Sequence, residues 1–99
     1  NNKEIYIKLE KAVGDNNVQE VIEYTHQHSD LDLNDENLYT LHPPLCRAAK
    51  NGFYEICKTL IQYGADVNCI KDRLFSPLWG ASSGNHLEIV KLLIEMVQI

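Results

Sequence analysis

The sequence lacks an excess of positive charge, and it lacks a long apolar run. Nine lysines and arginines stand against fourteen aspartates and glutamates, which gives the 99 residues a formal net charge of −5. Nucleic-acid phosphates and anionic membrane surfaces attract clustered basic residues, so this balance argues against both as partners. No apolar stretch approaches the roughly 20 residues that cross a bilayer, and the amino end shows no secretory signal. We therefore expect no nucleic-acid partner and no membrane.

Cysteine and methionine are also scarce. Three cysteines without a Cys-x-x-Cys pair fit neither a disulfide framework nor a four-ligand zinc site. Free thiols suit a reducing compartment, so we expect the cytoplasm or the nucleus. The chain begins with Asn1 and its only methionine is Met96, so we expect a fragment of a longer protein.

Spacings typical of metal-binding and catalytic residues are missing. Residues 30–34 resemble the start of a calcium loop, but Asp35 replaces the required glycine and Leu41 replaces the required glutamate. His42 and Cys46 are four residues apart, but two prolines separate them and zinc needs more ligands nearby. No nucleophile, base and orienting group form a set. We expect no enzyme activity, no metal and no cofactor.

The sequence does contain an internal repeat. Residues 44–58 match residues 77–91 at a constant offset of 33, and residues 12–21 match residues 48–57 more weakly at an offset of 36. Such periods indicate supersecondary units that stack on one another. Cys57 occupies an apolar position of the repeat, so we expect a buried thiol and not a nucleophile.

Each copy carries the signals of two short helices. Ser76 directly before Pro77 can cap the first helix of the last copy. Asn17, three residues before Glu20, has the spacing of a capping box at the start of a second helix. Gly64 is expected in the left-handed conformation that ends a helix.

Two expectations concern packing. Leu87, Val90, Leu93 and Ile94 recur at helical spacing, so we expect them to form one apolar face that stacking of the copies buries. Ala48 and its counterpart in the next copy are small, so we expect tight packing between neighbouring helices there.

The repeated unit resembles the ankyrin repeat. The family's Pro-Leu, paired alanines, Glu-Ile-Val-Lys-Leu-Leu and Gly-Ala-Asp-Val-Asn stand here as Pro44-Leu45, Ala48-Ala49, residues 88–93 and residues 64–68. The resemblance covers nearly the whole chain. It implies an all-α solenoid of helix-turn-helix units joined by hairpin-like loops. Within a single domain over residues 1–99, the expected repeats lie at about 5–37, 38–70 and 71–99.

Several positions depart from the family pattern. Pro43 replaces the capping threonine, and a lost cap typically costs about 1 kcal/mol. Leu41 and Leu74 replace the hairpin glycines, so we expect reshaped hairpins. Trp79 replaces the family's histidine.

The resemblance implies a protein–protein interaction module, which binds a partner protein through a concave face of hairpin tips and first helices. An alternative role for Tyr39 and Phe75 is to fill gaps in the altered hairpins. An alternative function is a non-catalytic segment that positions a catalytic or effector domain of a larger protein. The expected contact residues are Tyr39, Thr40, His42, Lys50, Asn51, Asp72, Arg73, Phe75 and Ser83.

Asn68 lies in a context similar to that of ankyrin asparagines hydroxylated by an oxygen-dependent asparaginyl hydroxylase. Leu60 precedes it by eight residues, and Asp66-Val67 stand directly before it. The alternative is an ordinary structural asparagine between repeats.

The carboxyl end is expected to expose an apolar surface. Part of it must pack on the second repeat, and the surplus predicts further ankyrin repeats or self-association. The alternative is a natural terminus whose last helix packs inward. The residues concerned are Leu78, Trp79, Leu92, Leu93, Ile94, Met96, Val97 and Ile99.

Overall fold

A computed structural model describes residues 2–35, 43–68 and 76–97, and every regular element in these residues is an α-helix. This confirms the predicted all-α fold. The predicted reshaping of the hairpins at Leu41 and Leu74 lies outside the described residues. The helices are α1 (Asn2–Gly14), α2 (Val18–Gln27), α3 (Pro44–Asn51), α4 (Tyr54–Gln62), α5 (Pro77–Ser83) and α6 (Leu87–Val97).

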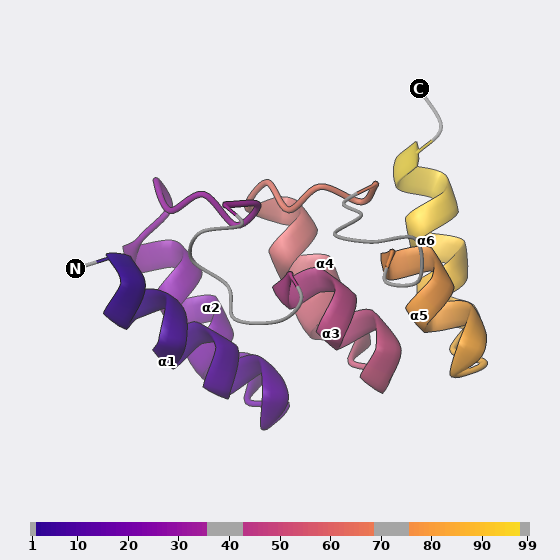
Figure 1. The fold of residues 1–99 in the computed structure, drawn as a ribbon, viewed down its shortest axis with the longest axis horizontal. Helices are drawn as coiled ribbons and strands as arrows, with labels where there is room; N and C mark the ends of the chain where they lie inside the picture. The colour runs from indigo at the N-terminus through magenta and orange to yellow at the C-terminus, as the bar shows by residue number, and fades with distance from the viewer. Residues whose placement is uncertain (1, 36–42, 69–75, 98–99) are drawn as a thin grey trace.

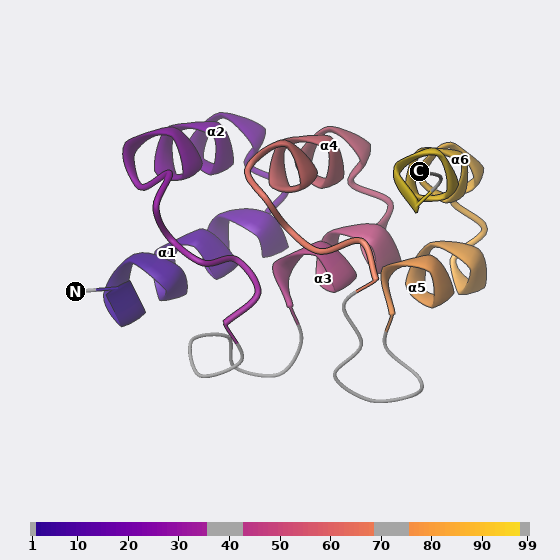
Figure 2. The ribbon, with the colours of Figure 1, turned by 90° about the horizontal axis from the view of Figure 1, so that it is seen from above.

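The six helices form three antiparallel pairs that stack side by side (Figure 1). The first helices α1, α3 and α5 make one layer, and the second helices α2, α4 and α6 make the other (Figure 2). Within each layer, neighbouring helices of successive pairs are in contact. The described connections 28–35 and 63–68 run from the second layer back towards the first. Each pair therefore packs mainly on its neighbours along the chain, as in a solenoid.

The same left-handed turn joins the two helices of every pair. Asn16, Gly52 and Asn85 have positive φ angles of 53°, 79° and 59°. The residue after each turn donates its backbone N–H to the carbonyl five residues earlier, at 2.8–3.0 Å. This bond satisfies a carbonyl at the helix end, and asparagine and glycine are the residues that tolerate the conformation best. The three turns are 36 and 33 residues apart, the same offsets that relate the repeats in the sequence.

Most predicted helix ends are confirmed. Ser76 accepts a hydrogen bond from the backbone N–H of Trp79 at 3.0 Å, and Pro43 provides no side-chain cap for α3. Asn17 accepts from the N–H of Glu20 at 3.2 Å, but the Glu20 carboxylate binds the Asn17 side-chain amide instead of the backbone. Gly64 follows the end of α4 with a φ of 100°.

One asparagine joins the connections of the first two repeats. Asn34 accepts from the backbone N–H of Asp66 at 2.8 Å and donates to the carbonyl of Gly64 at 3.0 Å. Asp32 and Asp66 accept from the N–H groups two residues later, Asn34 and Asn68, at 2.9 Å each. The two connections therefore share one conformation and are hydrogen-bonded to each other.

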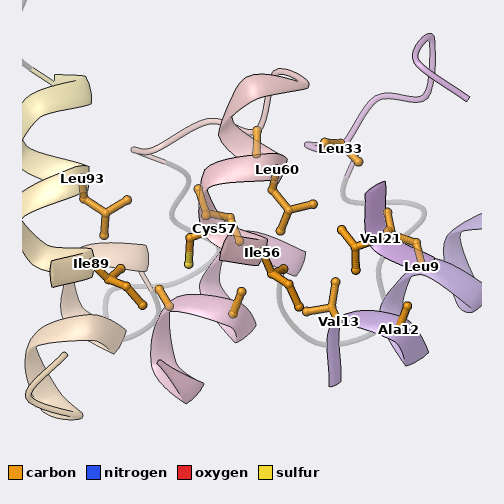
Figure 3. Close-up of a cluster of buried hydrophobic side chains, with 14 of the residues drawn as sticks. Leu9, Ala12, Val13, Val21, Leu33, Ile56, Cys57, Leu60, Ile89 and Leu93 are labelled. Atoms are coloured by element: carbon orange, nitrogen blue, oxygen red, sulfur yellow. The ribbon is translucent and has the colours of Figure 1, made fainter. Parts of the chain in front are cut away.

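The core is a continuous row of apolar side chains between the two layers, to which all three pairs contribute (Figure 3). Ala48, Ala49 and Ala81 on the first helices are completely buried, as the repeat pattern predicts. Their small side chains allow the first helices to approach closely. The larger buried residues include Leu9, Val13, Val21, Ile56, Leu60, Ile89 and Leu93.

The predicted apolar face of the last helix is buried only in part. Leu93 is buried and Val90 is half-buried, together with Ile89, which the spacing did not single out, whereas Leu87 is 68% exposed and Ile94 is 45% exposed. Both exposed residues lie on a side of α6 that nothing covers in the described chain. Helical spacing identifies an apolar stripe, but it does not say whether that stripe faces the core or the end of the stack.

The turn at Gly52 gives a first prediction. A Cβ there would lie 2.6 Å from the His86 ring, and the φ of 79° is already unfavourable for alanine. We expect Gly52→Ala to lower the unfolding free energy by about 2 kcal/mol or more in urea titrations. The matched control is Gly64→Ala, which has a φ of 100° and no atom within 4 Å of the added Cβ, so only the backbone cost of about 1 kcal/mol applies. Equal losses would contradict a steric role for His86.

The packing of the first helices gives a second prediction. Ala48→Leu forces extra volume between α3 and its neighbours, and overpacking typically costs about 1–3 kcal/mol. The urea midpoint should fall clearly. Lys50→Ala, two residues away and exposed, should leave it nearly unchanged. Similar midpoints for the two variants would show that the repeat register is wrong.

Candidate protein-binding surfaces

The described residues include three of the nine predicted contact positions. Lys50 and Asn51 end α3, Ser83 ends α5, and all three are exposed. Lys50 and Ser83 occupy the same position of successive repeats, so they lie at matching ends of adjacent helices. The other six predicted positions lie outside the described residues: Tyr39, Thr40, His42, Asp72, Arg73 and Phe75.

The backbone of α3 fits closely against α5. A Cβ on Gly80 would lie 3.3 Å from the Cα and nitrogen of Lys50, a contact tighter than ordinary packing. The His86 ring nitrogen Nε2 lies 2.9 Å from the Lys50 carbonyl and can donate a hydrogen bond to it. The end of α3 is therefore fixed to the third repeat through its backbone, while the Lys50 side chain remains exposed.

Arg47 occupies a similar place between the first two repeats. Its guanidinium carbon lies 3.4 Å from where a Cβ on Gly14 would be, at the last residue of α1. Cations are favoured at this end of a helix because unpaired carbonyls gather there. Sequence reasoning missed Arg47, although the offset of 36 aligns it with Lys11 and so places two cations on adjacent first helices.

Asn68, the predicted hydroxylation site, is exposed in the segment 63–68 that follows α4. Its backbone N–H donates to the carboxylate of Asp66. It occupies the position of Asn34, whose side chain joins two connections. Both predicted roles, a modification site and a structural asparagine, fit this position.

The far end of the stack carries several exposed apolar side chains, which we call the end surface. Leu78, Trp79, Leu87, Ile94 and Met96 are each more than 40% exposed. Of the other residues predicted there, Leu93 is buried and Leu92 is half-buried. The side chain of Val97, and Ile99, lie outside the described residues.

The equivalent positions of the second repeat are shielded from solvent. Leu45 and Cys46, the counterparts of Leu78 and Trp79, are only 1% and 5% exposed. The counterparts of Leu87, Ile94 and Met96 are half-buried. The second repeat has a further helix pair packed on it, whereas among the described helices none packs on the far side of the third. The end surface therefore corresponds in position to the face of the second repeat that packs on the third.

Neither a reactive cysteine, a metal site nor a membrane-spanning helix is apparent in the described residues. Burial raises the pKa of Cys57 to about 12, so its thiol stays protonated and unreactive at neutral pH. Among residues 2–35, 43–68 and 76–97, no three histidine, cysteine or acidic side chains gather as metal ligands could. Across the same residues, no helix has the length and apolar character that a bilayer crossing requires.

Stacked helix pairs with a repeated left-handed turn define a helical repeat protein. Three copies of the ankyrin repeat match residues 9–99, so the chain belongs to the ankyrin-repeat family. Ankyrin repeats generally bind other proteins and are typically non-catalytic.

Two relatives show how short the chain is beside other members. Over 54 residues it is 44% identical to alpha-latrocrustotoxin-Lt1a of Latrodectus tredecimguttatus, a match that covers 54% of this chain and 4% of the toxin. Over 53 residues it is 43% identical to a protein of Rickettsia felis named only as an ankyrin repeat protein, covering 52% of this chain and 24% of that protein. The chain therefore spans a small part of either relative.

Proposed function

We propose that this chain is a protein–protein interaction module whose partner protein binds the surface made by the first helices and the connections beside them. The observation that carries the proposal is the alignment of the first helices in one layer, with Lys50, Asn51 and Ser83 exposed at matching helix ends. The remaining contacts in this proposal come from Tyr39, Thr40, His42, Asp72, Arg73 and Phe75. The proposed compartment is the cytoplasm or the nucleus, where the buried thiols of Cys46 and Cys57 stay reduced.

The alternative function is supported by the size of the relatives. Because the matched regions are 4% and 24% of those proteins, an ankyrin segment of this size can belong to a much larger protein. In that case the segment positions a catalytic or effector domain and has no active site of its own.

Hydroxylation of Asn68 is a further proposal for the same chain. Its exposed position after Asp66 leaves the side chain open to an enzyme. The modification adds 16 Da, so mass spectrometry of the chain isolated from its host would identify it at this residue.

We also propose that the end surface is covered by another helix pair, from further ankyrin repeats or from a second copy. The proposal is supported by the equivalent residues of the second repeat, which are buried or half-buried in a repeat on which α5 and α6 pack. Exposed apolar patches of this kind usually mark an interaction surface.

The proposed binding surface predicts the effect of three substitutions. With a partner identified by affinity capture and mass spectrometry, Tyr39→Ala, Arg73→Ala or Phe75→Ala should each weaken binding by about 1 kcal/mol or more, as anchor residues do. Lys58→Ala on α4, in the opposite layer, is the control and should have no effect. Unchanged affinity in all three variants would place the site elsewhere, for example on the second helices.

The end surface predicts concentration-dependent association. The sedimentation coefficient of the isolated chain should rise with concentration, because its apolar end has no partner. Leu87→Glu with Ile94→Glu should abolish the rise. Ile22→Glu is the control, because Ile22 is 40% exposed on α2 at the other end of the stack. A chain that stays monomeric and gains no stability from an added ankyrin repeat would show that the third repeat needs no cover.

A further inference from the structure

The charges of this acidic chain are segregated between its two layers. The first helices carry five basic and two acidic residues, and one of the acidic residues, Glu10, is only 8% exposed. The second helices carry five acidic and two basic residues. The described connections add five aspartates and no lysine or arginine. The layer of first helices is therefore positive in a chain whose net charge is −5.

Four of the exposed cations form one surface, which we call the first-helix patch: Lys3, Lys11, Arg47 and Lys50. Lys3 and Lys11 lie one helical turn on either side of Ile7, which is 51% exposed, so the three form a stripe along α1. Arg47 is the repeat counterpart of Lys11 on the adjacent helix, and its guanidinium lies against the end of α1. The patch thus runs continuously from α1 to α3 and has an apolar centre.

Two exposed carboxylates, Glu4 and Asp15, lie beside the four cations of this patch, so the patch keeps a positive balance. Within the described residues its only salt bridge joins Lys11 to Asp15 at 3.1 Å, and both side chains are largely exposed. A hydrogen bond and the charge of Asp15 raise the pKa of Lys11, so this lysine remains protonated. Exposed pairs four residues apart are weak, and they exchange readily for another carboxylate.

We propose that the first-helix patch binds an acidic peptide segment of the partner protein, with an apolar residue of that segment placed on Ile7. This inference rests on the proposed function and specifies the chemistry of the partner. Carboxylates of the segment would approach the lysines and Arg47, and guanidinium groups can bind carboxylates through two parallel hydrogen bonds. Complementary charge of this kind raises the association rate and fixes the register of binding.

A short segment fits the patch better than a large polyanion does. α1 has 13 residues and is about 20 Å long, which an extended peptide of roughly six to eight residues spans. A nucleic acid or an anionic membrane would extend beyond the patch and meet the exposed aspartates of the connections, including Asp30, Asp32 and Asp66. The net negative charge of the whole chain repels such large surfaces at long range.

The test is selection of binders from a displayed library of random peptides about twelve residues long, longer than the patch. We expect the selected peptides to be enriched in aspartate and glutamate around one apolar position. Synthetic copies of these peptides are then titrated against the wild-type chain and two variants by fluorescence anisotropy at low and high salt.

The two variants are matched in residue type and in charge. Lys3→Glu with Lys50→Glu reverses two exposed lysines of the patch, and Lys58→Glu with Lys91→Glu reverses two exposed lysines of the second helices. We expect the first pair to weaken binding about tenfold or more and to reduce its salt dependence, and the second pair to change it less than about twofold. Circular dichroism and thermal melting establish that both variants remain folded.

The possible results separate this inference from the proposed function. Selected peptides that are not acidic but still lose affinity with the first pair would overturn the acidic chemistry and leave the binding surface in place. Equal losses with both pairs would overturn the patch, because they indicate only the effect of net charge. Tighter binding of single-stranded DNA of similar length would overturn the choice of a peptide. Selected peptides whose affinity does not change with the first pair of substitutions would overturn the proposed surface itself. A selection that yields no binding peptides would do the same.

Discussion

The close approach of the first helices is the constraint on which the rest of this structure depends. A pair of short helices cannot bury enough apolar surface alone, so each pair must pack on the next. Ala48, Ala49, Gly80 and Ala81 allow that approach because they have little or no side chain, and a Cβ on Gly80 would already press on the backbone of Lys50. The second helices then lie close enough for Ile56, Leu60, Ile89 and Leu93 to form one continuous core.

The same constraint determines which surfaces remain for binding. Since the small residues face the neighbouring helices, the long polar side chains of α3 point out of the stack at Arg47, Lys50 and Asn51. His86 bonds to the carbonyl of Lys50 and not to its side chain, so the inter-repeat contact leaves the amine available. In Lys50, the backbone therefore holds the repeats together, while the side chain remains available to contact a partner.

Much of this fold could be predicted from the sequence, because the periods of 33 and 36 align the features that form it. Pro77 after Ser76, Asn17 before Glu20, and Gly64 each give a local signal with a local cause, and the structure confirms the helix end at each, although the Glu20 carboxylate binds the Asn17 side chain and not its backbone. The left-handed turns at Asn16 and Asn85 were not identified, although both align with Gly52. The exposure of Leu87 could not be deduced, because a periodic stripe does not reveal which neighbour is absent.

The candidate sites were less predictable, because they depend on distances between helices. The contacts of Arg47 with Gly14, and of Lys50 with Gly80 and His86, arise only when residues about 33 apart in the chain come together. Charge segregation is different: it is visible in the sequence once each residue is assigned to a first or a second helix.

The first-helix patch and the end surface differ in chemistry, and this difference separates their roles. The hydrophobic effect that favours covering the end surface does not depend on direction and depends little on salt, so this surface suits a permanent contact between repeats. The charged patch gives less free energy because water and ions screen it, but it can steer a partner and release it again. The patch lies on α1 and α3 and the end surface on α5 and α6, so the two can be occupied together. A stack extended beyond α6 would therefore keep the patch open, and a partner bound there would not compete with the growth of the solenoid.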